Sequence, residues 1–199
     1  DLDEEEDLAA RVMEKMNSEN DSVLKDRIKV CDGRLPKGAP ATFLNNAKMV
    51  KLITDWWKVA MKNPSSWKCK GTDNNIYTFL NDYLTAYKEV FPEAWDNKNY
   101  VLTKTMGFDI IFSICNQLTL NAVDISGVNR LPDKDAFVSI LQKVFFTKDD
   151  SGNMVPVEVE LDGENAVPFN WESSIYGSHS SGKGINILKK IVEQLIISR

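Results

Sequence analysis

The stretch MGFDIIFSICNQLTL, residues 106–120, decides the fold class of this chain. It is the centre of a mostly apolar segment, residues 100–123, in which Gly107 is the one residue that disfavours a helix. An apolar segment of this length without a further breaker predicts one well-buried helix. The side chains expected in the core are Val101, Met106, Phe108, Ile110, Ile111, Phe112, Ile114, Leu118 and Leu120.

Apolar residues recur at helical spacing on both sides of this segment. An amphipathic helix near the amino end carries Leu8, Ala9, Val12, Met13 and Met16. Further helices are expected from an N-cap at Thr42 to before Pro64, after Thr72 to before Pro92, after Leu131-Pro132-Asp133, and from residue 185 to the end. The helix after Asp133 turns Phe137, Ile140, Leu141, Val144 and Phe145 inward, and the last carries Ile185, Leu188, Val192 and Leu195, flanked by Ile191 and Ile196.

Strand periodicity is found in one place. Residues 154–161 alternate apolar and polar side chains, although Pro156 restricts the segment to a sheet edge. Residues 143–148 are a candidate partner, but Phe145 and Phe146 fit the preceding helix. A Ser/Gly-rich loop is expected from Trp171 to Gly184.

These patterns predict a mainly α, compact helical domain of about five or six helices with a small β-hairpin or edge-strand excursion near residues 145–170. We expect a single domain, 1–199, with a helix and loop arm (1–40), a helical core (41–148), a β/loop excursion (149–183) and a terminal helix (184–199).

Composition excludes several classes of protein. The chain has 199 residues, a formal net charge of −5, and no apolar run near the ~20 residues of a transmembrane helix, so no membrane partner is expected. Its acidic start, without an initiator Met, is unlike a signal peptide and indicates a piece of a longer protein. The thiols of Cys31, Cys69 and Cys115 are widely spaced, which fits a reducing, cytoplasmic compartment.

No residue pattern predicts a catalytic or metal centre. His179 is the one histidine, and neighbouring serines on the same loop cannot easily reach it in nucleophile–base geometry. The carboxylates at 149–153 and 158–164 lack the spacing of an EF-hand. We therefore expect no cofactor, and no catalytic residue in this chain.

The segment Lys48–Lys70 is locally basic and carries interleaved tryptophans at 56, 57 and 67. Lys51, Lys58 and Lys62 fall on nearly one side of the expected helix. Such a stripe attracts nucleic-acid phosphates, and an exposed indole can stack on a base. The alternative is an ordinary solvated helix face with the tryptophans in the core.

Residues 177–184, GSHSSGKG, come close to the phosphate-binding pattern G-x-x-x-x-G-K-[ST] and precede a helix. Backbone N–H groups here can cradle an anion, with Lys183 adding charge. Gly184 stands where a magnesium-binding hydroxyl is needed, and only fifteen residues follow it, which argues against nucleotide hydrolysis. The alternative is a flexible, glycine-rich helix entry. The candidate anion-binding residues are Gly177, Ser178, Ser180, Ser181, Gly182 and Gly184.

Several stretches together resemble one family. They are DLAARVMEKMN (7–17) running into DSVLKDRI (21–28), FLNDY (79–83) to VFPEAW (90–95), LTKTMGF (102–108), and the loop and helix of 177–188. In this order they resemble the part of DGQHR-domain proteins, which include the DndB-like proteins of DNA phosphorothioation systems, that follows the eponymous motif. The motif itself is absent, because Cys31-Asp32-Gly33-Arg34 is not followed by His.

The resemblance implies a role in prokaryotic DNA modification, defence or its transcriptional control. It also implies that a DGQHR-bearing N-terminal half lies outside this chain, so no catalytic residue is carried over. The first hypothesis is a non-catalytic helical module that contacts DNA phosphates through Lys51, Lys58, Lys62, Lys183 and the 177–184 loop. The alternatives are a protein-interaction or homo-oligomerisation module without DNA contact, and a nucleotide-binding enzyme fragment.

Overall fold

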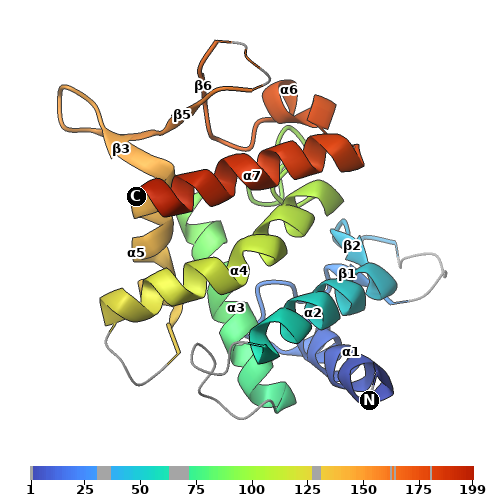
Figure 1. The fold of residues 1–199 in the computed structure, drawn as a ribbon. Coiled ribbons are helices and arrows are strands. Elements are labelled where there is room, and N and C mark those ends of the chain that lie inside the picture. Colours follow the sequence, from blue (N-terminus) through green and yellow to red (C-terminus); the bar gives the residue numbers. More distant parts are fainter. Residues whose placement is uncertain are drawn as a thin grey trace.

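A computed structural model describes residues 2–30, 37–62, 72–126, 131–161, 163, 165–179 and 181–199. Within these ranges the chain is mainly helical, with small two-stranded sheets, which confirms the predicted fold class (Figure 1). The helices are α1 (Leu2–Ser18), α2 (Asn46–Met61), α3 (Asp73–Val90), α4 (Thr105–Ser126), α5 (Lys134–Phe145), α6 (Ser173–Tyr176) and α7 (Gly182–Ser198). The strands are β1 (Ile28–Lys29), β2 (Leu44–Asn45), β3 (Phe146–Lys148), β4 (Met154–Pro156), β5 (Glu158–Val159) and β6 (Val167–Pro168).

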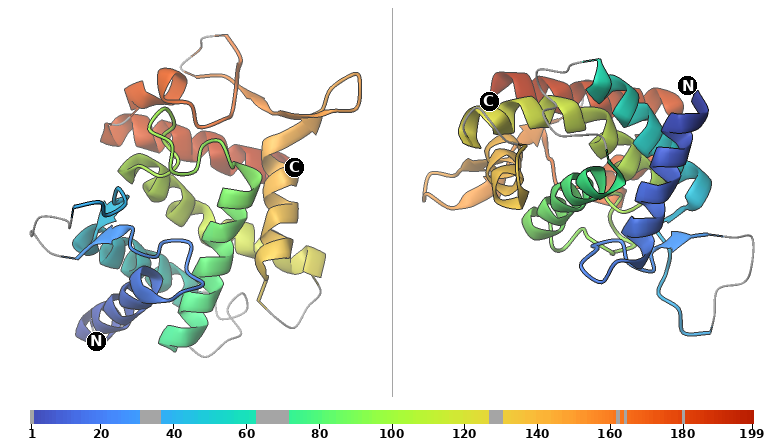
Figure 2. Two further views of the ribbon diagram at one scale, coloured as in Figure 1. Left: turned by 180° about the vertical axis from the view of Figure 1, so that it is seen from behind. Right: turned by 90° about the horizontal axis from the view of Figure 1, so that it is seen from below.

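Five long helices form a closed ring of neighbours. α1 packs on α2 and α3, α2 packs on α4, α4 packs on α5, and α5 packs back on α3. α7 lies on the outer side of this ring, mainly against α4 (Figures 1 and 2). Viewed from below, α7, α4 and α2 lie on one side, α5 and α3 lie on the other, and α1 runs across both (Figure 2).

The predicted apolar stripes make the core between these helices. Ala9, Val12, Met13 and Met16 of α1 are buried, and the five expected side chains of α5 are buried as well. In α7 the buried stripe is Leu188, Val192 and Ile196, while Ile185, Ile191 and Leu195 are partly buried. Leu120 of α4 is an exception, since 45% of its surface is exposed, and so is Met61 of α2, which helical spacing places on the apolar stripe but which is 53% exposed.

Helix α2 begins later than the sequence predicts. Asn45, not Thr42, is its N-cap, and the Asn45 side chain accepts a hydrogen bond from the Lys48 N–H at 2.8 Å. Residues 44 and 45 are held in β2, which pairs in parallel with β1, so the chain cannot enter the helix before Asn46. The helix predicted after Thr72 is confirmed as α3, with Thr72 as its N-cap, as is an end before Pro92.

Helix α4 begins at Thr105 and not at residue 100. The N–H of Val101 donates to the carbonyl of Trp171 at 2.8 Å, and Tyr100 forms an antiparallel bridge with Glu172. These bonds keep residues 100–101 extended beside a distant segment. Val101 is nevertheless buried, as predicted, and so is Leu102, because this entry segment packs against the first turn of α4.

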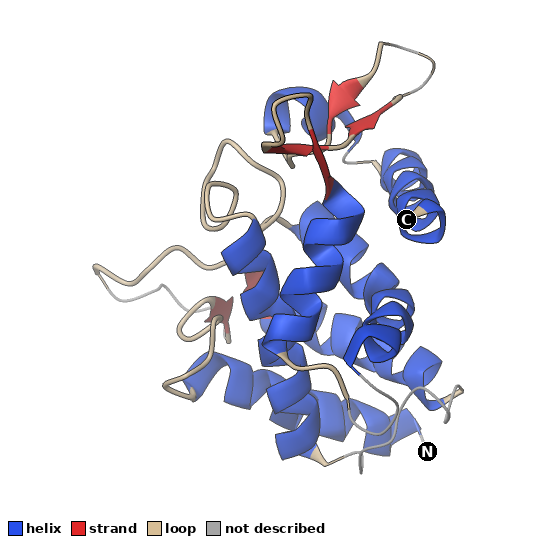
Figure 3. Ribbon diagram, turned by 90° about the vertical axis from the view of Figure 1, so that its left-hand side faces the viewer, coloured by secondary structure: helices blue, strands red, loops and turns tan. Residues whose placement is uncertain are grey.

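The β excursion is a hairpin followed by a smaller pair of strands (Figure 3). β4 pairs antiparallel with β3, so the 143–148 segment supplies the partner strand, which begins as soon as α5 ends. β5 pairs with β6, and the alternation continues with Val157, Val159 and Leu161 buried. Pro156 lies on an open edge, where its missing N–H costs no ladder bond.

The Ser/Gly-rich segment of residues 171–184 is more ordered than predicted. It contains α6 and a 3-10 turn, Gly177–His179, and α7 already begins at Gly182. Among the described helices, none combines the length and the apolar character needed to cross a lipid bilayer.

Candidate functional site

Two of the candidate lysines on α2 are paired with carboxylates. Lys51 Nζ lies 2.7 Å from Asp55 Oδ2, one turn along the same helix, and this hydrogen bond and charge raise the pKa of Lys51. Lys58 Nζ lies 3.6 Å from Glu5 Oε2 of α1. Each phosphate approaching these ammonium groups would meet a carboxylate too, which weakens their attraction for a polyanion.

The other two candidate lysines are exposed but lie apart. Lys62 caps the C-terminal end of α2, and Lys183 lies in the first turn of α7. Neither has an acidic partner among the described residues. α4 lies between α2 and α7, so the structure does not bring Lys183 onto the lysine-bearing face of α2 (Figure 1).

The 177–184 loop is a connection between helices. Gly177 caps α6 in a right-handed helical conformation and then enters the 3-10 turn. Ser181 is the N-cap of α7, and its Oγ accepts a hydrogen bond from the Gly184 N–H at 3.2 Å. One donor of the predicted anion cradle is therefore satisfied within the chain. Ser180 lies outside the described residues; Gly182 and Ser178 are exposed, and Gly184 is buried.

In the part of the chain that the structure describes, the buried polar groups offer no reactive side chain. Cys115 is completely buried in α4, and burial raises the pKa of its thiol far above the ordinary value. A thiol held protonated in the core is a poor nucleophile. Burial likewise raises the pKa of Tyr83, whose hydroxyl donates to the Ile111 carbonyl at 2.6 Å. Among the described residues no cluster of metal-ligating side chains is present.

A first surface pocket lies between α1 and α2. It encloses about 440 Å³ and is lined by Glu6, Asn46, Ala47, Val50, Lys51, Thr54, Asp55 and Lys58. Its lining carries two carboxylates, of Glu6 and Asp55, and two ammonium groups, of Lys51 and Lys58, so opposite charges cancel within the pocket. This balance leaves no strong preference for an anion or for a cation.

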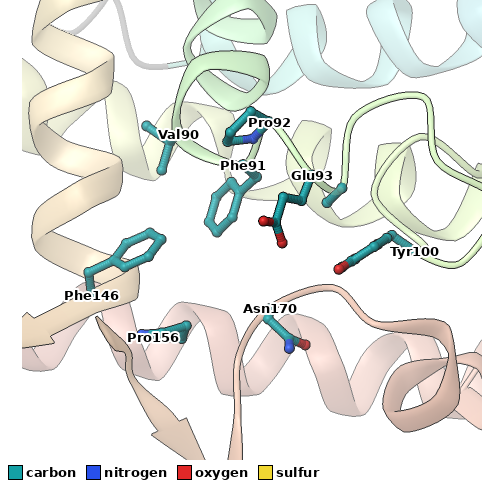
Figure 4. Close-up of a pocket in the computed structure, with 9 residues that line it drawn as sticks. Val90, Phe91, Pro92, Glu93, Tyr100, Phe146, Pro156 and Asn170 are labelled. Carbon is teal, nitrogen blue, oxygen red and sulfur yellow. The ribbon is translucent and has the colours of Figure 1, made fainter. Parts of the chain in front are cut away.

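A second pocket has a different, apolar character, and it is the candidate functional site (Figure 4). We call it the aromatic groove. It encloses about 360 Å³ and is lined by Val90, Phe91, Pro92, Glu93, Ala94, Tyr100, Phe146, Pro156 and Asn170. The volume lies within the range of known ligand pockets, and apolar side chains predominate in its lining.

One wall of the aromatic groove is the turn that ends α3. Pro92 has no N–H to continue the helix, and the Phe91 N–H makes the last helical bond, to Tyr87 O at 2.9 Å. The Phe91 ring is buried against Phe145 and Trp171, which fixes the start of the turn. The turn then exposes Pro92 and Glu93.

The opposite wall is the base of the β3–β4 hairpin. Phe146 and Pro156 are directly paired across the two strands, so their side chains lie on the same face. The ring of Phe146 lies 5.6 Å from that of Phe91, tilted by 31°, and this contact joins the two walls. Figure 4 shows both rings directed towards the same space.

Tyr100 and Asn170 close one end of the aromatic groove. They belong to segments joined by the Tyr100–Glu172 bridge and by the bond from the Ser173 N–H to Asn99 O at 2.8 Å. The Asn170 side chain is held by Glu172, because its Oδ1 accepts a hydrogen bond from the Glu172 backbone N–H at 3.2 Å. In Figure 4 the Tyr100 hydroxyl and the Glu93 carboxylate both point into the groove.

Sequence reasoning did not find the aromatic groove. In the sequence, Pro92 indicates only the end of a helix, and Phe146 fits the apolar pattern of the helix that follows Asp133. The lining comes from five segments spread between residues 90 and 170, and nothing in the local pattern shows that they meet. The sequence signal for the groove is a proline directly after an apolar residue in two places, Pro92 after Phe91 and Pro156 after Val155.

Comparisons with protein families, with curated protein sequences and with solved structures find no match to this chain. The functional conclusion therefore rests on the geometry of the site.

Proposed function

We propose that this chain is a non-catalytic protein-interaction module and that a segment of a partner protein occupies the aromatic groove. The observation that carries the proposal is the groove itself, in which Phe91, Phe146, Pro92 and Pro156 present apolar surface beside three polar side chains. Apolar anchoring with a few polar groups at the edge is the composition that peptide-recognition sites use.

The walls of the groove are preformed, which supports this use. Phe91 packs on Phe145 and Trp171, and the hairpin base follows directly from α5. Binding a segment on rigid walls costs less conformational entropy than ordering a flexible surface. By contrast, the buried Cys115 and Tyr83 offer no exposed reactive group in the described part of the chain.

The resemblance to DGQHR-domain proteins suggests where such a segment comes from. Under this proposal the DGQHR-bearing N-terminal half of a parent protein, or a second copy of this chain, supplies the segment. A role in DNA modification or defence then comes from the assembled protein, with this module holding its parts together.

The test replaces one wall of the groove. Phe146→Ala removes the ring that bridges the walls, whereas Met154→Ala removes an exposed side chain of the same hairpin and serves as the control. Both variants and the original protein are incubated with beads carrying capped random pentapeptides, and bead retention is measured. We expect Phe146→Ala to lower retention about tenfold and Met154→Ala to leave it unchanged. Equal retention of all three proteins would refute the proposal.

Contact with DNA phosphates, which the sequence predicts, is the alternative proposal, and the placement of the lysines argues against it. It rests on Lys62 and Lys183, which are exposed, since Lys51 and Lys58 are paired with carboxylates. Because these cations lie on separate parts of the surface and the net charge is −5, we expect little retention on a nonspecific duplex.

The measurement is fluorescence anisotropy of a labelled duplex at low and at moderate salt. The variant carrying Lys→Ala at positions 51, 58, 62 and 183 is expected to match the original protein within about twofold. Tight, salt-dependent binding that the four substitutions abolish would instead favour DNA contact.

A further inference from the structure

We propose that the partner segment is anchored in the aromatic groove by a lysine or arginine side chain, held between the aromatic rings and the carboxylate of Glu93. This inference rests on the proposed function and specifies the chemistry of its occupant.

Charge at the groove points to a cation. Glu93 is the one charged side chain among the nine that line it, and Figure 4 shows its carboxylate directed into the space. No lysine or arginine in the described ranges lies within ion-pair distance of this carboxylate. The Asn97 side chain donates to the Glu93 backbone carbonyl at 2.9 Å, which fixes the turn that carries it.

The rings suit the rest of such a side chain. The half-buried Phe146 and Tyr100 present aromatic surface in the groove, with the buried Phe91 ring behind them, and the face of an aromatic ring attracts an ammonium or guanidinium group. The methylene stem of lysine or arginine can pack on Pro92 and Pro156, while its charged head reaches Glu93. The Tyr100 hydroxyl, which points into the groove, offers a further hydrogen-bond acceptor for the head group (Figure 4).

Other occupants fit less well. A phosphate or carboxylate would face Glu93 with no cation in the lining to offset the repulsion. A purely apolar side chain would cover the Glu93 carboxylate without pairing it, which is costly. Arg199 donates to the Phe146 carbonyl at 3.2 Å and is not part of the lining.

The experiment uses the whole chain and four bead libraries. Each library holds capped pentapeptides whose central residue is fixed as lysine, arginine, norleucine or glutamate, with the other positions random. Norleucine matches the lysine stem without its charge. The proteins are the original chain, Glu93→Gln, Phe146→Ala, and Glu14→Gln, a control that makes the same charge change on an exposed residue of α1.

We expect the original chain to be retained about fivefold more on the lysine and arginine libraries than on norleucine, and least on glutamate. Glu93→Gln should reduce the lysine-to-norleucine ratio to about one, while Glu14→Gln keeps it at about five. The preference should also weaken as salt rises, because the groove is open to solvent.

The two proposals fail in different ways. Equal retention on lysine and norleucine beads, with Phe146→Ala still lowering both, would overturn the cationic anchor and leave the interaction groove standing. Retention that Phe146→Ala does not change would overturn the interaction groove and the anchor with it.

Discussion

Gly107 shows how a single residue controls the start of α4. A Cβ atom at this position would lie 2.1 Å from the carbonyl oxygen of Leu102 and 2.4 Å from that of Val101. The entry segment therefore folds back directly against the helix, and only glycine leaves room for it. The same segment carries Tyr100, so this close approach also helps to set the end of the aromatic groove.

Gly107→Ala should therefore destabilise the protein by at least about 2 kcal/mol, because backbone atoms must move to admit the new methyl group. The matched control is Gly182→Ala in the first turn of α7, where an added Cβ meets no atom within 4 Å. That change should be neutral or stabilising by up to about 1 kcal/mol. Urea unfolding measures both free energies, and similar values for the two variants would contradict this account.

At the scale of elements, capping decides where helices begin. Asp133 accepts from the Ala136 N–H at 3.0 Å at the start of α5, as Thr72 does for Asn75 in α3. Both caps lie just before the first apolar residue of their helices, and both starts are predictable from sequence. The α2 cap was predicted wrongly at Thr42, because the pairing of β2 with β1 delays the helix by three residues.

The corrected cap makes a direct prediction. Asn45→Ala should lower the free energy of unfolding by about 1 kcal/mol, since the Lys48 N–H loses its acceptor at the N-terminal end of α2. Thr42→Ala, the position that the sequence favours, should change stability by less than about 0.5 kcal/mol. Thermal unfolding followed by circular dichroism measures both. A larger loss for Thr42→Ala than for Asn45→Ala would instead indicate that Thr42 is the N-cap of α2.

Across the whole molecule, an aromatic cluster joins the helical ring to the β excursion. The cluster consists of Phe91 at the end of α3, Phe145 of α5, and Phe169 and Trp171 between β6 and α6. Where these rings touch, their centres lie between 5.0 and 6.2 Å apart. All four are buried. Because this cluster belongs to the same core as α1–α5, the excursion and the helices are expected to unfold together.

Phe169→Ala should therefore destabilise the entire protein by ~3–5 kcal/mol, since it removes a fully buried ring. Tryptophan fluorescence and far-ultraviolet circular dichroism should report one coincident urea transition in both the original chain and the variant. Met154→Ala on the exposed hairpin is the control and should stay within about 0.5 kcal/mol. Two separate transitions would show that the excursion folds as an independent unit.

The six long helices can be predicted from the sequence alone, because burying an amphipathic stripe of 3.6-residue period leaves a pattern that can be counted along the chain, whereas the short α6 is not predicted. The strand segment at 154–161 can also be predicted, because burying one face of a strand leaves an apolar residue at every second position. The tertiary structure was needed to show that α2 starts at Asn46 and that Lys51 and Lys58 are paired with carboxylates. It was also needed to show which residues line one groove, among them Phe91, Tyr100, Phe146 and Asn170. These depend on contacts between segments tens of residues apart, and such contacts leave no local period in the chain.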